Sequence, residues 1–205
     1  RSEQFESAAA AFKEALALDG YSDEARKGLL DTEVAIKEDE FASIMSEGYR
    51  LLEAGKSSQA IEKFRMAGEL GINANEAKIA VVQTENAIAS SEIKRLRVDA
   101  ELAVQQELWT DASNFYKEAL AIDSNLSFAT EGLDYATKRV RLDVLLLQAL
   151  DNPERLAENS VYDETMEIYL IGRAVEQTGP RLAKMLNQLE TTLEQSQIPI
   201  EVIFR

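Results

Sequence analysis

The chain has 205 residues, of which 45% are hydrophobic, and this composition suffices for the packed interior of a folded protein. Its formal net charge of −15 disfavours nucleic acid and anionic membrane surfaces as partners and mildly favours basic ones. Cysteine and histidine are absent, which excludes disulfides, catalytic triads and thiolate or imidazole metal sites within this chain. We therefore expect no catalytic residues, no cofactor and no metal site.

The first quarter of the chain predicts a short helix followed by a long one. Residues 5–18 carry apolar side chains at helical spacing, and an Asp-Gly pair ends the run. Residues 23–54 contain no proline and are rich in Glu, Ala, Leu and Lys, so we predict one continuous helix. Gly28 and Gly48 are its weak points, each costing about 1 kcal/mol relative to alanine.

The alternation of short and long helices continues to about residue 150. We expect a short helix over 59–70, because glycine-containing segments precede and follow it, and a third copy of the short helix over 110–123. Longer helices are expected over 75–107 and 126–150, where helical apolar spacing runs without proline.

The C-terminal part departs from this alternation. Asn152 before Pro153 is typical of a helix start, and two further helices are expected over 160–177 and 180–195. The apolar residues over 198–204 predict a β-strand. A lone strand has no sheet to join, so we expect a longer protein in which a β-rich segment follows. The predicted organisation is helical repeats over 1–150, a helical cap over 151–197 and a strand over 198–205.

One pattern recurs three times at a fixed spacing of 52 residues. Each copy places an aromatic residue between two alanines within a short helix, and further apolar positions agree in the same register. Such a repeat predicts a stacked array, because single units of this size cannot bury their apolar faces alone. The three copies are Ala8, Phe12 and Ala15, then Ala60, Phe64 and Ala67, then Ala112, Tyr116 and Ala119.

The spacing of alanine and aromatic residues resembles helix B of the tetratricopeptide repeat (TPR) family. The small residue that this family carries on helix A corresponds to Gly48 and Ala100, and Gly55 lies at the turn of the family pattern. The resemblance implies an all-α fold, a TPR-like α-solenoid in which short and very long helices alternate.

The period of this chain exceeds that of the family by a whole number of helical turns. The family repeats every 34 residues, about 18 fewer, which is about five turns. An insertion of whole turns leaves the buried stripe of the helix facing the same way. We therefore expect two short helices to pack on each long helix, in an elongated array. A break near Asp39-Glu40, giving three helices per unit, is the alternative, although no proline or capping pair marks it.

The resemblance also implies a peptide-binding groove lined by residues of helix A. Carried over through the small residue of that helix, the pattern selects Met45, Tyr49 and Leu52 in one copy and Arg97 and Glu101 in the next. The first three form an apolar and aromatic stripe at helical spacing, which suits an incoming helix or extended peptide. The alternative is that a neighbouring long helix of this chain covers the stripe.

These features predict a non-catalytic scaffold that binds a protein or peptide partner. The alternatives are a structural spacer or self-assembly element, and an enzyme that uses only carboxylates and tyrosines. The longest apolar run, around 144–147, is far shorter than the ~18 residues of a membrane span, so we expect no direct insertion into a membrane.

Helical repeats followed by a strand also resemble bacterial envelope proteins in which a membrane-anchored TPR region precedes a β-rich domain. This resemblance implies a periplasmic location, with an inner-membrane anchor outside this chain. The absence of cysteine agrees equally with the cytoplasm, which is the alternative.

Overall fold

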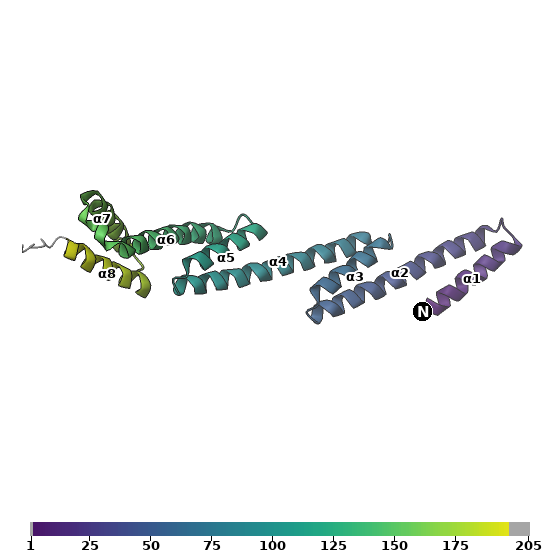
Figure 1. Cartoon of the computed structure of the whole chain (residues 1–205). Coiled ribbons are helices and arrows are strands. Elements are labelled where there is room, and N and C mark those ends of the chain that lie inside the picture. Colours follow the sequence, from purple (N-terminus) through teal and green to yellow (C-terminus); the bar gives the residue numbers. More distant parts are fainter. Residues whose placement is uncertain (1, 197–205) are drawn as a thin grey trace, which may run out of the picture. The chain divides into compact units, whose positions relative to one another are not determined.

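The computed structural model describes residues 2–196, and this part of the chain is all-helical (Figure 1). Eight α-helices and one short 3-10 helix occupy it, with no strand among the described residues. The all-α prediction is therefore confirmed for this range, whereas the strand predicted over 198–205 lies outside the described residues. The chain divides into two compact units, Arg1–Ser91 and Glu92–Arg205, which are considered in turn.

The first unit contains two short helices that pack on one long helix. Figure 1 shows α1 beside the N-terminal half of α2 and α3 beside its C-terminal half. The long helix is continuous, so the alternative of a break near Asp39-Glu40 is wrong. The elements are α1 (Ser2–Leu18), α2 (Asp23–Glu53), α3 (Ser57–Glu69) and the first part of α4 (Ala74–Gln105).

The start of α2 carries a cap that helix periodicity alone did not identify. The Ser22 hydroxyl accepts a hydrogen bond from the Ala25 backbone N–H at 3.2 Å, and Asp23 and Glu24 follow in the first turn. The hydroxyl satisfies one of the unpaired N–H groups at the start of the helix, and the two carboxylates are attracted to the partial positive charge of that end. A serine cap and two carboxylates therefore define where this long helix begins.

The two glycines of α2 are contact sites rather than only weak points. A β-carbon at Gly28 would collide with the ring of Phe12 on α1, and one at Gly48 with the ring of Phe64 on α3. Phe64 is fully buried. The cost of glycine within a helix is thus offset by the close approach of an aromatic ring from each short helix.

The second unit contains the end of α4 and all the remaining helices. Tyr116 of α5 lies against Gly132 of α6, where a β-carbon would collide with its ring. The core around Tyr116 also includes Leu96 and Ala100 from α4. The elements are α5 (Trp109–Ile122), α6 (Ser127–Asp151), the 3-10 helix η1 (Pro153–Ala157), α7 (Asn159–Arg173) and α8 (Pro180–Ser196).

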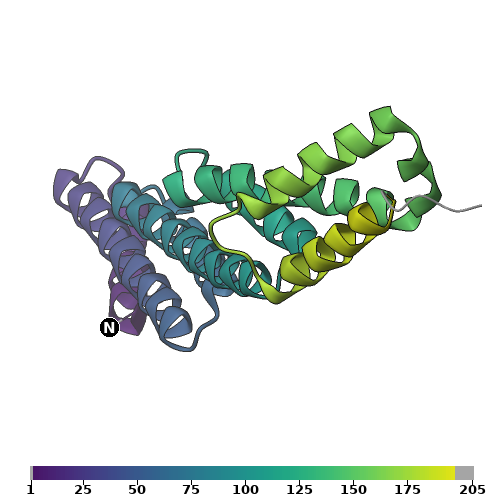
Figure 2. The same ribbon diagram turned by 90° about the vertical axis from the view of Figure 1, so that its left-hand side faces the viewer.

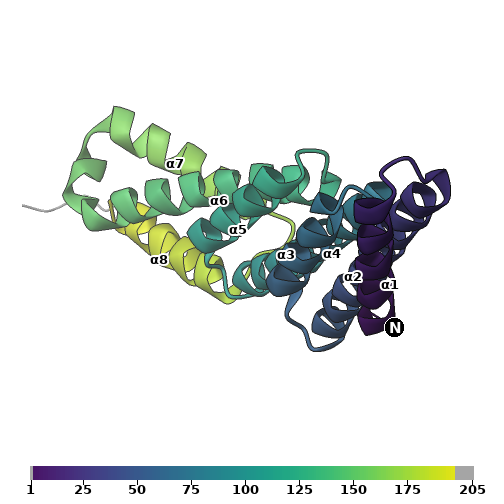
Figure 3. The same ribbon diagram turned by 90° about the vertical axis from the view of Figure 1, so that its right-hand side faces the viewer.

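A second core of this unit lies between α6, α7 and α8, which Figures 2 and 3 show side by side. Leu146 of α6 and Leu182 and Leu189 of α8 are fully buried in it. The predicted helix start at Asn152 and Pro153 is confirmed, because the 3-10 helix η1 begins at Pro153. The Asn152 side chain does not cap it, however, and donates to the Gln148 carbonyl at 3.1 Å. The two helices that follow begin within a residue of their predicted starts.

We predict that alanine at Gly48 destabilises the first unit by about 1–3 kcal/mol, because its β-carbon must displace the buried Phe64 ring. Alanine at Gly68 is the matched control. It also replaces a helical glycine, but there the β-carbon makes an ordinary 3.6 Å contact, so helix propensity should stabilise by up to about 1 kcal/mol. Urea denaturation followed by circular dichroism measures both, and equal effects of the two changes would contradict the packing argument.

Candidate functional site

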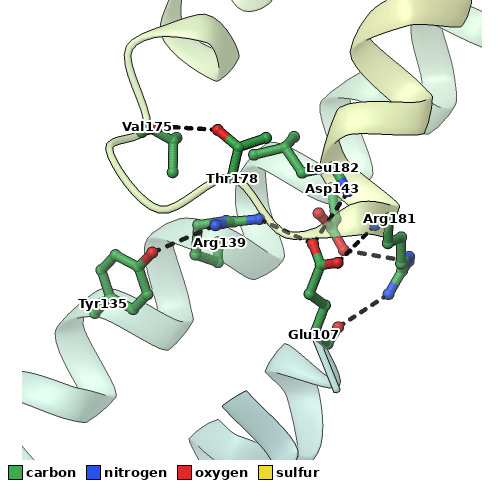
Figure 4. A network of polar contacts seen from close by, with 8 residues as sticks. All are labelled: Glu107, Tyr135, Arg139, Asp143, Val175, Thr178, Arg181 and Leu182. Carbon is green, nitrogen blue, oxygen red and sulfur yellow. Dashed lines mark hydrogen bonds and ion pairs between the residues drawn. The ribbon is translucent and has the colours of Figure 1, made fainter. Parts of the chain in front are cut away.

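A buried cluster of charged side chains lies in the second unit, where the turn before α5 meets α6 and the start of α8 (Figure 4). Its centre is Glu107, whose side chain is 5% exposed. Its two carboxylate oxygens accept hydrogen bonds from the backbone N–H groups of Arg181, at 2.6 Å, and Leu182, at 3.0 Å. The first N–H groups of a helix have no partner inside it, so Glu107 caps α8 from 74 residues earlier in the chain.

The approach of this carboxylate to α8 depends on a glycine. Gly179 directly precedes the helix, and a β-carbon there would collide with the carboxylate of Glu107. The Glu107 backbone carbonyl also accepts a hydrogen bond from Nη1 of Arg181 at 3.1 Å. Both the side chain and the backbone of one residue therefore hold the start of α8.

Glu107 adopts a left-handed backbone conformation, with φ of 55°. One period of 52 residues earlier the same position is Gly55, with φ of 71°. A side chain in this conformation costs about 1–2 kcal/mol, which glycine avoids. A glutamate held in this way indicates that its side chain has a role that outweighs the strain, and here that role is the cap of α8.

Arg139 of α6 neutralises the carboxylate of Glu107 inside the protein. Its guanidinium lies 3.6 Å from the Glu107 carboxylate, 4.3 Å above the ring of Trp109 and 3.3 Å from the hydroxyl of Tyr135. The rings of Trp109 and Tyr135 meet edge to face at 5.5 Å. A buried carboxylate without such a partner would be strongly destabilising, so the ion pair and the aromatic ring make the buried cap tolerable.

A second ion pair joins α6 to α8 beside the first. Nη2 of Arg181 lies 3.2 Å from Asp143, whose side chain is 11% exposed. Burial raises the pKa of the Asp143 carboxyl, and the guanidinium groups of Arg181 and Arg139 offset part of this rise. The cluster therefore contains two carboxylates and two guanidinium groups, and its charges balance.

A pocket of about 280 Å³ lies next to this cluster in the second unit. Asp143 and Arg181 belong to both the cluster and the pocket, together with the buried Trp109. The indole N–H of Trp109 has no hydrogen-bond partner in the described part of the chain. The walls are formed by Leu108, Thr110, Asp111, Val140, Val144 and Leu147.

The cluster holds helices together and offers no chemistry of its own. Its two carboxylates are occupied by N–H groups and guanidinium groups, so neither is positioned as a free acid or base. Among residues 2–196, no group of three or more acidic side chains is arranged to hold a metal ion. No helix in the same range is both long enough and apolar enough to cross a membrane.

The structure separates the predicted residues of the first unit by burial. Met45 is 4% exposed and belongs to the apolar core with Phe64, and Leu52 packs partly buried against the same core. Tyr49 remains 46% exposed, with its ring 5.0 Å from that of Phe64. The short helix α3 thus packs against this stripe and leaves Tyr49 as its accessible member, and a binding role for the stripe stays a prediction.

The two predicted residues of the second unit lie together on the surface. Nε of Arg97 is 2.8 Å from the carboxylate of Glu101, and its guanidinium lies 5.0 Å from the centre of the Phe128 ring. About half of each charged side chain is exposed. Their pairing is the ordinary i, i+4 contact of a helix surface, and it leaves both side chains accessible to a partner.

Sequence reasoning did not identify Glu107, Arg139 or Arg181. The signal that could have found the first is the 52-residue register, in which Glu107 replaces Gly55 at a turn that favours glycine. No pattern within α6 or α8 indicates that Arg139 and Arg181 meet it, because the contact depends on how the C-terminal helices pack.

Comparisons of this chain with protein-family models, curated proteins and solved structures found no match.

We predict that Glu107→Ala destabilises the second unit by about 3–5 kcal/mol, since it uncaps α8 and leaves Arg139 buried without its carboxylate. Glu107→Gly removes the same carboxylate but suits the left-handed backbone, so it should cost about 1 kcal/mol less. Urea denaturation followed by the fluorescence of Trp109, the single tryptophan, measures both changes. An alanine variant as stable as the wild type would contradict the capping role.

The pH dependence of stability should reveal the burial of Asp143. Because its pKa is raised in the folded state, the folded protein binds a proton at this site more tightly than the unfolded chain does. As pH rises from the ordinary pKa of 3.8 through the raised folded value, the wild type should lose stability relative to Asp143→Asn. Paired denaturation curves across this window measure the difference, and a difference with the opposite slope would contradict the assignment.

Proposed function

We propose that this chain is a non-catalytic protein–protein interaction scaffold built from TPR-like repeats. The observation that carries the proposal is one contact that recurs in both units. Phe12 meets Gly28 in the first unit and Tyr116 meets Gly132 in the second, and both members of the second pair lie 104 residues, or two periods, after those of the first. A recurrence of sequence and contact together is what a repeat array requires.

The surface of the helices supports binding rather than catalysis. Tyr49 in the first unit is accessible, and so is the pair of Arg97 and Glu101 in the second; aromatic residues and arginine are enriched in protein interfaces. The charged groups of the buried cluster in the second unit pair with one another and hold helices together, so they are not free to bind a partner. A binding surface on a rigid helical framework is therefore the function that these residues suit best.

A spacer is the second candidate, and the length of the helices favours it. Helices α2 and α4 contain 31 and 32 residues, which correspond to about 46–48 Å each. Helices of this length hold their ends far apart at little cost in sequence. As a spacer or self-assembly element, the array positions another domain of a longer protein or associates with further copies of itself.

For location, we propose the periplasm, with the anchor in a segment outside this chain, and the cytoplasm as the alternative. The support is the order of helical repeats and a C-terminal apolar segment, together with the absence of cysteine. The sequence of the gene upstream of Arg1 tests this proposal, because an anchored form needs a hydrophobic segment there.

We predict that a photo-reactive amino acid at position 49 cross-links a discrete partner protein in an extract of the source cells. After the partner is identified and purified, Tyr49→Ala and Arg97→Glu should each weaken its binding about tenfold, a typical loss for an interface anchor. Tyr21→Ala is the matched control, because Tyr21 is 90% exposed and lies outside the predicted groove. Equal affinity in all variants would remove these residues from the binding site.

Light scattering separates the scaffold from the self-assembly element. A scaffold should remain monomeric as its concentration rises and should form a complex of defined mass with the partner. Growth of the mass with concentration in the absence of a partner would favour the second candidate instead.

A further inference from the structure

The pocket beside the charged cluster is lined by an apolar stripe on α6. Val140, Val144 and Leu147 follow helical spacing along one face of this helix. Val144 and Leu147 are 47% and 42% exposed, and Leu108 from the start of α5 is 43% exposed on the same pocket. Single exposed apolar residues are common on protein surfaces, but three that line one pocket indicate a binding surface for a partner.

The repeat shows that this stripe is particular to its copy. The positions of Val144 and Leu147 correspond to Glu92 and Arg95 one copy earlier, and to Glu40 and Ser43 two copies earlier. Repeat packing therefore does not need apolar residues here, since charged or polar ones serve in the other two copies. The apolar pair in α6 calls for a different explanation.

The pocket lining also includes charged side chains with different roles. Asp111 is exposed and forms no ion pair with any described residue. Asp143 and Arg181 already neutralise each other.

These groups define the chemistry of an occupant. The volume of about 280 Å³ suits one large apolar side chain, and Asp111 suits a cation. The net charge of −15 attracts a basic segment to the whole chain. An acidic segment would meet the unpaired Asp111 instead.

We propose that this pocket binds a peptide segment of a partner protein that presents one large apolar side chain next to a lysine or arginine. The apolar side chain lies between Leu108, Val144 and Leu147, and the basic group pairs with Asp111. The inference rests on the proposed scaffold function and deepens it, because it names the class of partner and a second place of contact.

The indole resonance of Trp109 provides a direct test, because the chain contains one tryptophan. The probes are three tripeptides, blocked at both ends: Lys-Leu-Lys, Lys-Ala-Lys and Glu-Leu-Glu. In the ¹H–¹⁵N spectrum of the whole chain, Lys-Leu-Lys should shift the indole signal saturably, with a Kd of about 1 mM or lower. The other two should bind at least about tenfold more weakly, since each lacks one of the two features.

Substitutions test whether the shift of the indole signal is caused by binding in the pocket. Val144→Glu restores the residue type of the other copies and should weaken binding of Lys-Leu-Lys about tenfold or more. Asp111→Asn should reduce the difference in affinity between Lys-Leu-Lys and Glu-Leu-Glu. Val98→Glu is the matched control, because Val98 is 63% exposed on α4 and does not line the pocket, so its variant should bind like the wild type.

Two outcomes would overturn the proposal: no saturable shift of the indole signal, or a shift of equal affinity in Val144→Glu. Either can occur while cross-linking at position 49 still captures a partner, so the pocket can fail without the scaffold function. Circular dichroism of each variant verifies that the helices are retained.

Discussion

The contact between an aromatic ring and a glycine is the constraint on which the helix pairs of both units depend. A ring can approach a helix backbone this closely only where no β-carbon intervenes, so Gly28, Gly48 and Gly132 determine where Phe12, Phe64 and Tyr116 pack. Each ring in turn sets the position of its short helix along the long one. The energy lost by placing glycine within a helix is thereby recovered through close packing, which explains why long helices with low intrinsic amphipathicity remain ordered.

The C-terminal helices depend on a different interaction, because the repeat pattern ends before them. There Glu107 lies in a turn, has a backbone conformation that favours glycine, and supplies the carboxylate that caps α8. Arg139 and Trp109 make this buried charge tolerable. Glu107, which stands 52 residues after Gly55, has thus provided the attachment point for α8.

The same region explains why a binding surface would arise beside the cap. Packing α8 against α6 uses the face of α6 that carries Leu142 and Leu146, and leaves the stripe through Val144 and Leu147 on another face. The charged cluster holds Arg181 and Asp143 beside that stripe, and Asp111 of the same pocket forms no ion pair with any described residue. Rigid support therefore lies next to an exposed carboxylate and an exposed apolar stripe.

The sequence by itself determined the helices, the continuity of α2 and the register in which aromatic and small residues recur, because helical periodicity and the absence of proline are local properties. It also suggested the stripe through Met45 and Tyr49. Only the tertiary structure decided that Met45 is core and Tyr49 surface, that the two glycines of α2 receive aromatic rings, and that Glu107 meets α8. Those outcomes depend on contacts between residues 16 to 75 positions apart, and a local pattern carries no information about which distant surfaces will pack together.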